Sequence, residues 1–226
     1  YKKLTIFGNY ALSYGRDDNE SLPADPYNLH AEWGPSSYGD IHHRAVLMAS
    51  APLPWKFAAS PFFVVNSGAP YNITTGLDPN HTGASTARPG LVAGPCEGRG
   101  CYNLYPMPGT AIEHNYGRGP GAVNLGLRVS RTWSFGPERV GASTDTGSRH
   151  GGMPGMTSNG ARRYGLTVTA SSLNALNHVN FAPPNGDLSS PYFGQYRALG
   201  GMIVMNHGGG ASTYNRKIDL QLRFTF

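Results

Sequence analysis

Histidine and aspartate side chains that could bind a metal ion gather in one stretch of the chain. His30 precedes Asp40, and the pair His42–His43 follows it. Imidazole nitrogens and a carboxylate suit a transition metal, but a site also needs ligands at a spacing that the fold can bring together. No ligand spacing repeats here. We therefore interpret these residues as polar loop residues beside an interface, and we predict no metal site.

A group of acidic residues could bind Ca²⁺ through carboxylate oxygens in an external loop. It comprises Asp17, Asp18, Glu20 and Asp25. We expect a solvated turn at this position instead of a calcium site.

Motifs that place catalytic residues are missing from the sequence. It contains no GxGxxG opening a helix, no phosphate-binding loop, no HExxH and no GxSxG. We predict a protein that is not an enzyme, has no catalytic residues and needs no cofactor.

The two cysteines, Cys96 and Cys101, enclose the four residues Glu-Gly-Arg-Gly. Two glycines let so short a segment bend into a small disulfide loop, whereas a zinc site would need more ligands close by. We expect a disulfide, and with it an oxidising, extracytoplasmic compartment. The chain begins at Tyr1 without an initiator Met or a signal peptide, so we expect a processed or excised piece of a longer protein.

The composition favours strands over helices. The chain has 226 residues with 31 Gly, 18 Pro, 11% aromatic residues and only 14% charged residues. Gly and Pro cost about 1 and 3 kcal/mol at a helix-interior position. The net charge of +5 is spread thinly and forms no Lys/Arg run, so we expect no nucleic-acid partner.

Apolar and polar residues alternate with a period of two in several segments, which is the pattern of a two-faced strand. The last ten residues, KIDLQLRFTF, show it most clearly. We predict one all-β domain over residues 1–226: an antiparallel up-and-down sheet of about six long strands. Their expected ranges are 3–14, 43–53, 60–75, 122–136, 164–176 and 214–226.

The connections between these strands differ greatly in length. Long, Gly- and Pro-rich loops are expected at 15–42, 76–121 and 177–213, and turns at 54–59 and 137–163. Long loops at one end of a sheet and short turns at the other are typical of outer-membrane barrels, although the Gly-rich 137–163 link departs from that rule.

Aromatic side chains near the strand ends help to decide which solvent the apolar faces meet. Interfacial aromatic girdles of membrane barrels lie there, whereas the core of a soluble sandwich would place more of them in mid-strand. We therefore expect the apolar faces to meet lipid and the polar faces a wet lumen. The expected interface aromatics are Tyr14, Trp133, Phe135, Tyr164 and Tyr214. Possible lumen-lining residues are Arg128, Lys217, Asp219 and Arg223, with charge balance as the alternative interpretation.

Several strings in this order resemble the C-terminal end of TonB-dependent outer-membrane receptors, most closely the Oar-like group with a carboxypeptidase-regulatory-like domain. They are ADPYNLHAEWGPSSYGDIHHRAVL, SPFFVVNSGAPYNITTG, NYGRGPGAVNLGLRVSRTWSFG, NALNHVNFAPPNGDLSSPYFGQ and KIDLQLRFTF. The resemblance covers nearly the whole chain and weakens at 78–108 and 137–160.

The resemblance implies that the chain forms barrel wall and extracellular loops of a receptor for ligand uptake. It does not indicate which ligand the receptor takes up. The family's plug and TonB box have no counterpart here, so TonB and the plug would be reached only through an N-terminal part. The terminal pattern Leu220, Leu222, Phe224 and Phe226 resembles the signal read by the barrel-assembly machinery. The implied location is the bacterial outer membrane, and the implied partners are its lipid and the remainder of the receptor barrel.

Six strands raise the question of what covers the two sheet edges. An open edge in hydrocarbon leaves about ten unpaired backbone groups, each costing several kcal/mol. The rest of a receptor or copies of the chain could cover them. The alternative function is therefore a processed fragment that self-assembles through strand edges and loops into an extracellular oligomer, tube or filament. A soluble carbohydrate-binding sandwich is a further alternative, because the loops are rich in aromatic residues.

Overall fold

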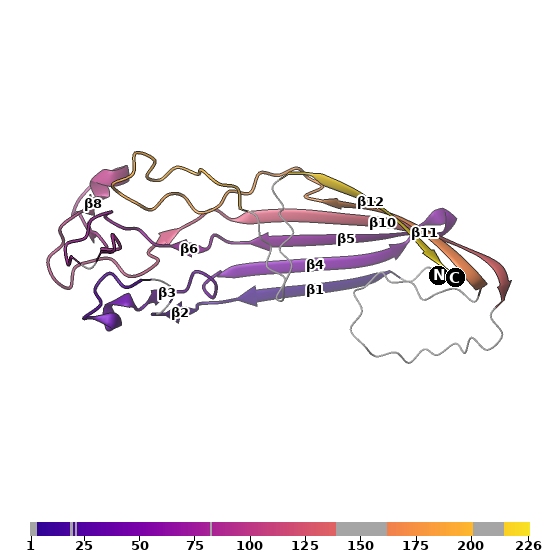
Figure 1. Ribbon diagram of the computed structural model, residues 1–226, viewed down its shortest axis with the longest axis horizontal. Coiled ribbons are helices and arrows are strands. Elements are labelled where there is room, and N and C mark those ends of the chain that lie inside the picture. Colours follow the sequence, from indigo (N-terminus) through magenta and orange to yellow (C-terminus); the bar gives the residue numbers. More distant parts are fainter. Residues whose placement is uncertain (1–3, 19, 21, 82, 139–161, 201–214) are drawn as a thin grey trace.

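The computed structural model describes residues 4–18, 20, 22–81, 83–138, 162–200 and 215–226. The predicted all-β fold is confirmed: the main element is a six-stranded antiparallel sheet in the order β1-β4-β5-β10-β11-β12. Its strands are β1 (Thr5–Leu12), β4 (His43–Pro52), β5 (Phe57–Asn66), β10 (Ala122–Glu138), β11 (Arg162–Leu173) and β12 (Lys217–Thr225). Neighbours in the sheet follow one another along the chain, which makes the sheet up-and-down (Figure 1).

The third strand differs most from its expected range. The strand predicted at 60–75 runs from Phe57 to Asn66. It begins early because Trp55 and Lys56 both adopt positive φ angles, 57° and 62°, and reverse the chain in two residues. The N–H of Phe57 donates to the carbonyl of Pro54 across this turn, which has the geometry of a type I′ hairpin. The expected turn at 54–59 is therefore shorter, with β4 ending at Pro52.

The same strand ends early because its continuation pairs elsewhere. Beyond Asn66 the chain forms β6 (Pro70–Tyr71), which pairs with β9 (Gly117–Arg118) in a separate two-stranded sheet. The strand expected at 164–176 likewise stops at Leu173, because Asn174 has a φ of 49° and its side chain bonds to the backbone of His178. Local turn geometry, which alternation does not reveal, sets these strand ends.

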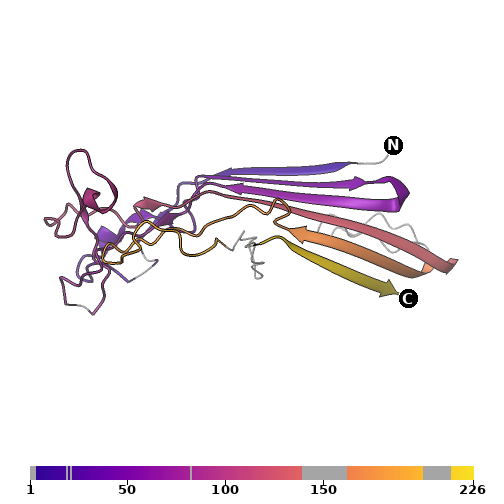
Figure 2. The same ribbon diagram turned by 90° about the horizontal axis from the view of Figure 1, so that it is seen from above.

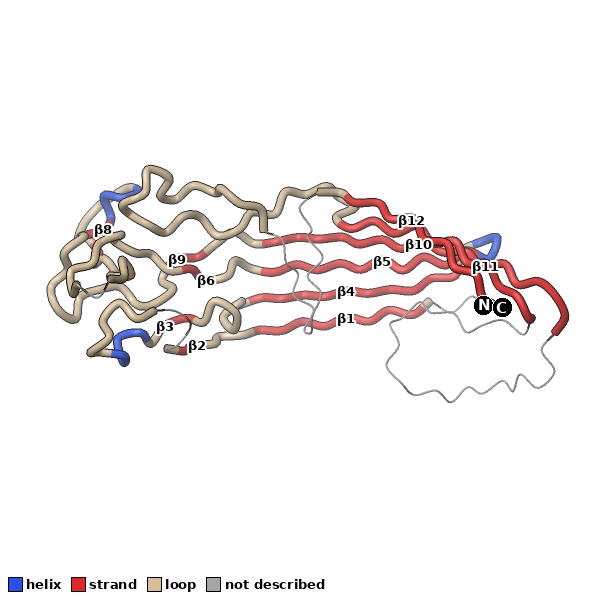
Figure 3. The backbone as a smooth tube through the Cα atoms, in the orientation of Figure 1, coloured by secondary structure: helices blue, strands red, loops and turns tan. Residues whose placement is uncertain are grey.

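The connections at 13–42, 67–121 and 174–200 lie together at one end of the sheet, and the β4–β5 turn, the start of β1 and the end of β12 lie at the other (Figures 1 and 2). We call the assembly formed by residues 13–42, 67–121 and 174–200 the loop layer. It holds short elements: β2 (Arg16–Asp17) pairs with β3 (Gly34–Pro35), and β7 (Gly90–Leu91) with β8 (Tyr102–Asn103). Three short 3₁₀ helices, η1 (Leu29–Glu32), η2 (Pro54–Lys56) and η3 (Gly98–Cys101), complete the described elements (Figure 3).

The described helical segments are all too short to cross a membrane. Most of the predicted 137–163 link, the end of the 177–213 loop and Tyr214 lie outside the described residues.

Candidate functional site: a two-faced sheet and its loop layer

The strand register places apolar side chains on one continuous face across all six strands. Residues paired across an antiparallel ladder share a face, so the row Leu125–Phe63–Leu47 continues from strand to strand. On the C-terminal strands this face carries Val129, Leu166, Val168, Ala170, Ile218, Leu220, Leu222 and Phe224. We call it the apolar face. Its β12 side chains and those of β1 are exposed in the single chain.

The opposite face, which we call the polar face, holds all four residues expected to line a lumen. Arg128, Ser171 and Asp219 form one row across β10, β11 and β12. Asp219 also forms an ion pair with Lys217, with 3.1 Å between Lys217 Nζ and Asp219 Oδ1. Arg223 lies on the same face opposite Thr167. The placement is compatible with a charged lumen and with local charge balance.

The polar face is not polar throughout. Phe7, Met48 and Phe62 form one row across β1, β4 and β5, and Val64 on the same face is buried. Alternation along β4 and β5 was weak in the sequence for this reason, since both faces of these strands carry apolar residues. The polar character of this face is therefore concentrated on β10, β11 and β12.

Aromatic rings gather on the apolar face at the turn end of the sheet. Phe135, Tyr164 and Phe224 stack across three strands with centroid distances of 5.9 Å and 6.3 Å, and Phe226 continues the row at 6.2 Å from Phe224. Trp133 lies on the same face, opposite Leu166. Three expected interface aromatics, Trp133, Phe135 and Tyr164, thus lie at one strand end, together with two residues of the expected assembly signal.

A second aromatic group lies where the sheet meets the loop layer. The Tyr10 hydroxyl and His43 Nδ1 are 2.7 Å apart, and the rings of Tyr14 and His42 are 4.5 Å apart between centroids. Tyr14 is the fourth expected interface aromatic. Tyr10 was not among the expected interface aromatics, and His43 had been considered only as a metal ligand.

Two of the three histidines considered for a metal site, His42 and His43, contact protein groups. Asp40 is held by the guanidinium of Arg118, which also donates to His42 Nε2 at 2.8 Å. His42 Nε2 lies 3.3 Å from the Asp40 carboxylate. A side-chain cation therefore occupies the position beside Asp40, and within the described residues no group of three potential ligands is arranged for a metal ion.

The expectation of a solvated acidic turn is wrong for Glu20. Its carboxylate accepts hydrogen bonds from Ser36 Oγ at 2.6 Å, from the Ser37 N–H at 2.7 Å and from Asn115 Nδ2 at 2.9 Å. Burial raises the pKa of Glu20, but these donors outweigh it and lower the pKa to about 2. Glu20 therefore joins the first long loop to the second as a carboxylate.

A buried ion pair crosses the same two loops. Arg88 Nη1 lies 2.7 Å from Glu32 Oε2, and both side chains are at most 5% exposed. The other carboxylate oxygen of Glu32 accepts from the Ala24 N–H, and Arg88 donates to the Ala31 carbonyl. His114 Nδ1 lies 3.4 Å from Glu32. No sequence pattern pointed to these residues, because charges so far apart in the chain have no spacing to recognise.

A small apolar core joins the second loop to the third. Ile73, Ile112 and Leu188 are buried together, with Tyr71, Tyr102 and Phe193 packed against them. Burial raises the pKa of both Tyr71 and Tyr102. Thr74 bonds through its backbone N–H and carbonyl to Gly186 and Leu188, so the contact is also a short strand-like pairing.

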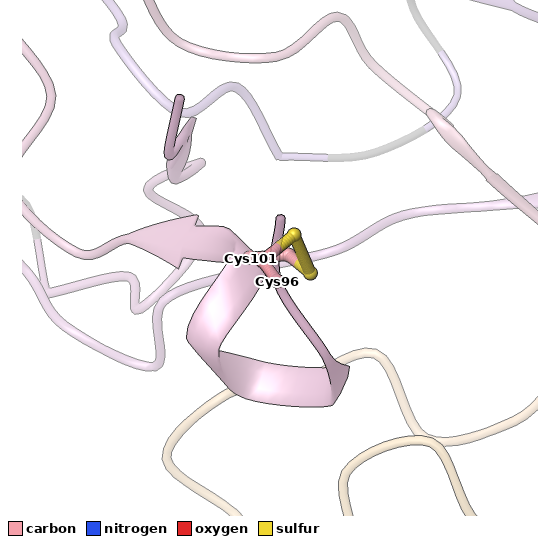
Figure 4. The surroundings of a disulfide bond; sticks show 2 residues. All are labelled: Cys96 and Cys101. Carbon is pink, nitrogen blue, oxygen red and sulfur yellow. A yellow bond between two sulfur atoms is a disulfide. The ribbon is translucent and has the colours of Figure 1, made fainter. Parts of the chain in front are cut away.

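Cys96 and Cys101 form a disulfide, as expected (Figure 4). It closes the short loop between β7 and β8, in which the Val92 N–H donates to the carbonyl of Cys101 at 2.9 Å. Arg99 in this loop bonds to the Ser190 carbonyl, and its guanidinium lies 5.9 Å from the ring centroid of Phe193. The disulfide loop is thereby attached to the third long loop.

Together these features define the class that the fold supports: an all-β protein with one continuous apolar sheet face and a cross-linked layer of loops at one end. No protein-family model matches the chain, and neither a curated protein nor a solved structure matches it.

Proposed function

We propose that the chain is the C-terminal β-barrel segment of a TonB-dependent outer-membrane receptor, forming barrel wall and extracellular loops for uptake of a ligand. The observation that carries the proposal is the apolar face, which runs across all six strands while their other face holds Arg128, Asp219 and Arg223. Membrane barrels have this alternation, apolar toward lipid and polar toward the lumen. A soluble sandwich would need a second layer to cover the apolar face.

The ends of the sheet support the same proposal. Aromatic rows at both ends of the strands correspond to the two membrane interfaces, where Trp and Tyr are enriched. The loop layer would then face the cell exterior, and the β4–β5 turn and the C-terminus the periplasm. In this role the chain has no catalytic function, and the remainder of the barrel pairs with β1 and β12.

Spin labels on neighbouring residues of β12 test the proposal. Leu222→Cys and Gln221→Cys would each carry one nitroxide on opposite faces of the same strand, in chains reconstituted in a lipid bilayer. We expect the label at 222 to collide with oxygen dissolved in lipid, and the label at 221 with a water-soluble nickel chelate. Equal access of the nickel chelate to both labels would contradict the proposal.

A second candidate function, self-assembly into an extracellular oligomer or filament, is favoured by the edges of the sheet. Among the described residues β1 pairs with β4 alone and β12 with β11 alone. Five antiparallel steps separate β1 from β12, so a copy's β1 beside β12 would continue the antiparallel order. Size-exclusion chromatography with light scattering in detergent-free buffer tests it: ring- or fibre-sized particles support self-assembly, and a monomer excludes it.

A further inference from the structure

Arg131 is an exception on the apolar face. Its register partners are Phe57 on β5 and Val168 on β11. Among the paired positions of this face in the six described strands, leaving aside the Glu138–Arg162 pair beyond the register shift in β10, Arg131 is the one Asp, Glu, Lys or Arg residue. A permanently charged guanidinium therefore stands among aliphatic and aromatic residues.

The surroundings of Arg131 hold its side chain without neutralising its charge. The guanidinium carbon lies 5.1 Å from the ring centroid of Phe57 and 4.6 Å from that of Trp133. Its Nε is buried and lacks a hydrogen-bond partner. None of the ion pairs among the described residues includes Arg131. The Phe57 and Trp133 rings therefore position the Arg131 guanidinium, but no anionic group among the described residues balances its charge.

Two further cationic residues lie at the turn end of the sheet. Lys56 lies in the β4–β5 turn directly before Phe57, and Arg163 lies near the start of β11 with its guanidinium 5.6 Å from the Tyr164 ring. The same end carries the aromatic row of Phe135, Tyr164 and Phe224, and Glu138 there is the register partner of Arg162. Basic residues beside an aromatic belt complement an anionic membrane surface.

We propose that Arg131, held between Phe57 and Trp133, binds the phosphate of a glycerophospholipid with an anionic headgroup at the turn end of the apolar face. The planar guanidinium donates two N–H groups to phosphate oxygens, as arginine does in bidentate phosphate recognition. The acyl chains of the same lipid would lie along the aliphatic residues of the apolar face. This inference rests on the proposed function, because it requires the apolar face to meet lipid.

Trp133 provides the signal for the test, since its ring contacts the Arg131 guanidinium. Replacing the exposed Trp33 and Trp55 by Phe leaves Trp133 as the single tryptophan. The chain would be reconstituted in bilayers containing either phosphatidylglycerol or phosphatidylcholine with brominated acyl chains, which quench tryptophan on contact. We expect half-maximal quenching at an at least fivefold lower fraction of phosphatidylglycerol than of phosphatidylcholine.

Two variants separate the site from general membrane charge. R131Q is expected to abolish the headgroup preference, while R128Q, three residues earlier on the polar face, keeps it. Equal effects of both substitutions would overturn the proposal. Added inorganic phosphate is expected to leave the quenching unchanged, and displacement of phosphatidylglycerol by millimolar phosphate would assign the site to a free anion and overturn the lipid assignment.

The same measurement distinguishes failure of this inference from failure of the proposed function. Equal quenching by the two brominated lipids overturns the Arg131 site but leaves the apolar face in contact with lipid. Absence of quenching by either lipid overturns both, because Trp133 would not meet acyl chains at all.

Discussion

Arg88 and Glu32, 56 positions apart in the sequence, form a buried ion pair that joins two long loops. The pair is supported by backbone partners on both sides, namely the Ala24 N–H and the Ala31 carbonyl. Buried charges are tolerated when they are paired and hydrogen-bonded. The loop layer is thus held by specific polar contacts as well as by its small apolar core.

We expect R88M to open the loop layer, because it leaves the Glu32 carboxylate buried without its cation. Breaking a buried pair typically costs about 3–5 kcal/mol. Hydrogen exchange with mass spectrometry should show lost protection in 22–42 and 83–92 and unchanged protection in β5 and β10. R16M is the matched control, because the Arg16–Glu113 pair is 41% and 40% exposed and should contribute about 0–1 kcal/mol. Equal effects of R88M and R16M would contradict the prediction.

Glu20 should make the loop layer sensitive to acid. Its folded-state pKa of about 2 lies below the ordinary value of 4.5, so the carboxylate stabilises the fold fully above pH 4.5. This contribution is lost as the pH falls from 4.5 through about 2. Solvent screening of the part-exposed group limits it to about 1 kcal/mol. Unfolding followed by Trp33 fluorescence, in chains with Phe in place of Trp55 and Trp133, should lose part of its pH dependence in E20Q, and an unchanged pH profile would argue against this assignment.

Gly68 lies in the loop layer, where two segments of the chain approach too closely for a side chain. A Cβ at this position would overlap the carbonyl oxygen of Gly119. We expect G68A to destabilise the protein by about 1–3 kcal/mol, as overpacking does. G100A is the control, because a Cβ there meets nothing within 4 Å. Thermal unfolding should separate the two variants, and similar midpoints would show that the backbone at Gly68 yields easily.

Arginine substitutions on β12 should differ by face. In the proposed barrel, L220R should cost about 2–4 kcal/mol, because it puts a charge on the lipid-facing side in the row of Ala170 and Val129, away from the turn end. Q221R, one residue away on the polar face, should have little effect. Urea unfolding in bilayers measures both. If Q221R were the more damaging variant, the assignment of faces would be reversed.

Removing the disulfide should act locally. The loop closed by Cys96 and Cys101 has a sequence separation of 5, for which loop closure gives about 2 kcal/mol. In the double variant C96S/C101S we expect faster hydrogen exchange in residues 90–103 and unchanged exchange in β10 and β11. Faster exchange throughout the sheet would mean that the disulfide loop supports more than the loop layer.

The sheet could be predicted from sequence because alternation is a local property. Side chains point to opposite faces with a period of two, so KIDLQLRFTF alone defines both faces of β12. Where both faces are apolar, as on β4 and β5, the pattern weakened and the end of β5 was misplaced. Positive φ angles at Trp55, Lys56 and Asn174 set the actual limits of the strands.

The sequence by itself determined the all-β class, the two-faced strands, the grouping of long loops at one end and the Cys96–Cys101 bond, since each depends on residues close together in the chain. Only the tertiary structure decided which distant residues meet. Register between strands brings Arg131 between Phe57 and Trp133, and loop packing brings Arg88 to Glu32 and Asn115 to Glu20. These contacts arise from backbone pairing and packing across long separations, and no local pattern of residue types encodes them.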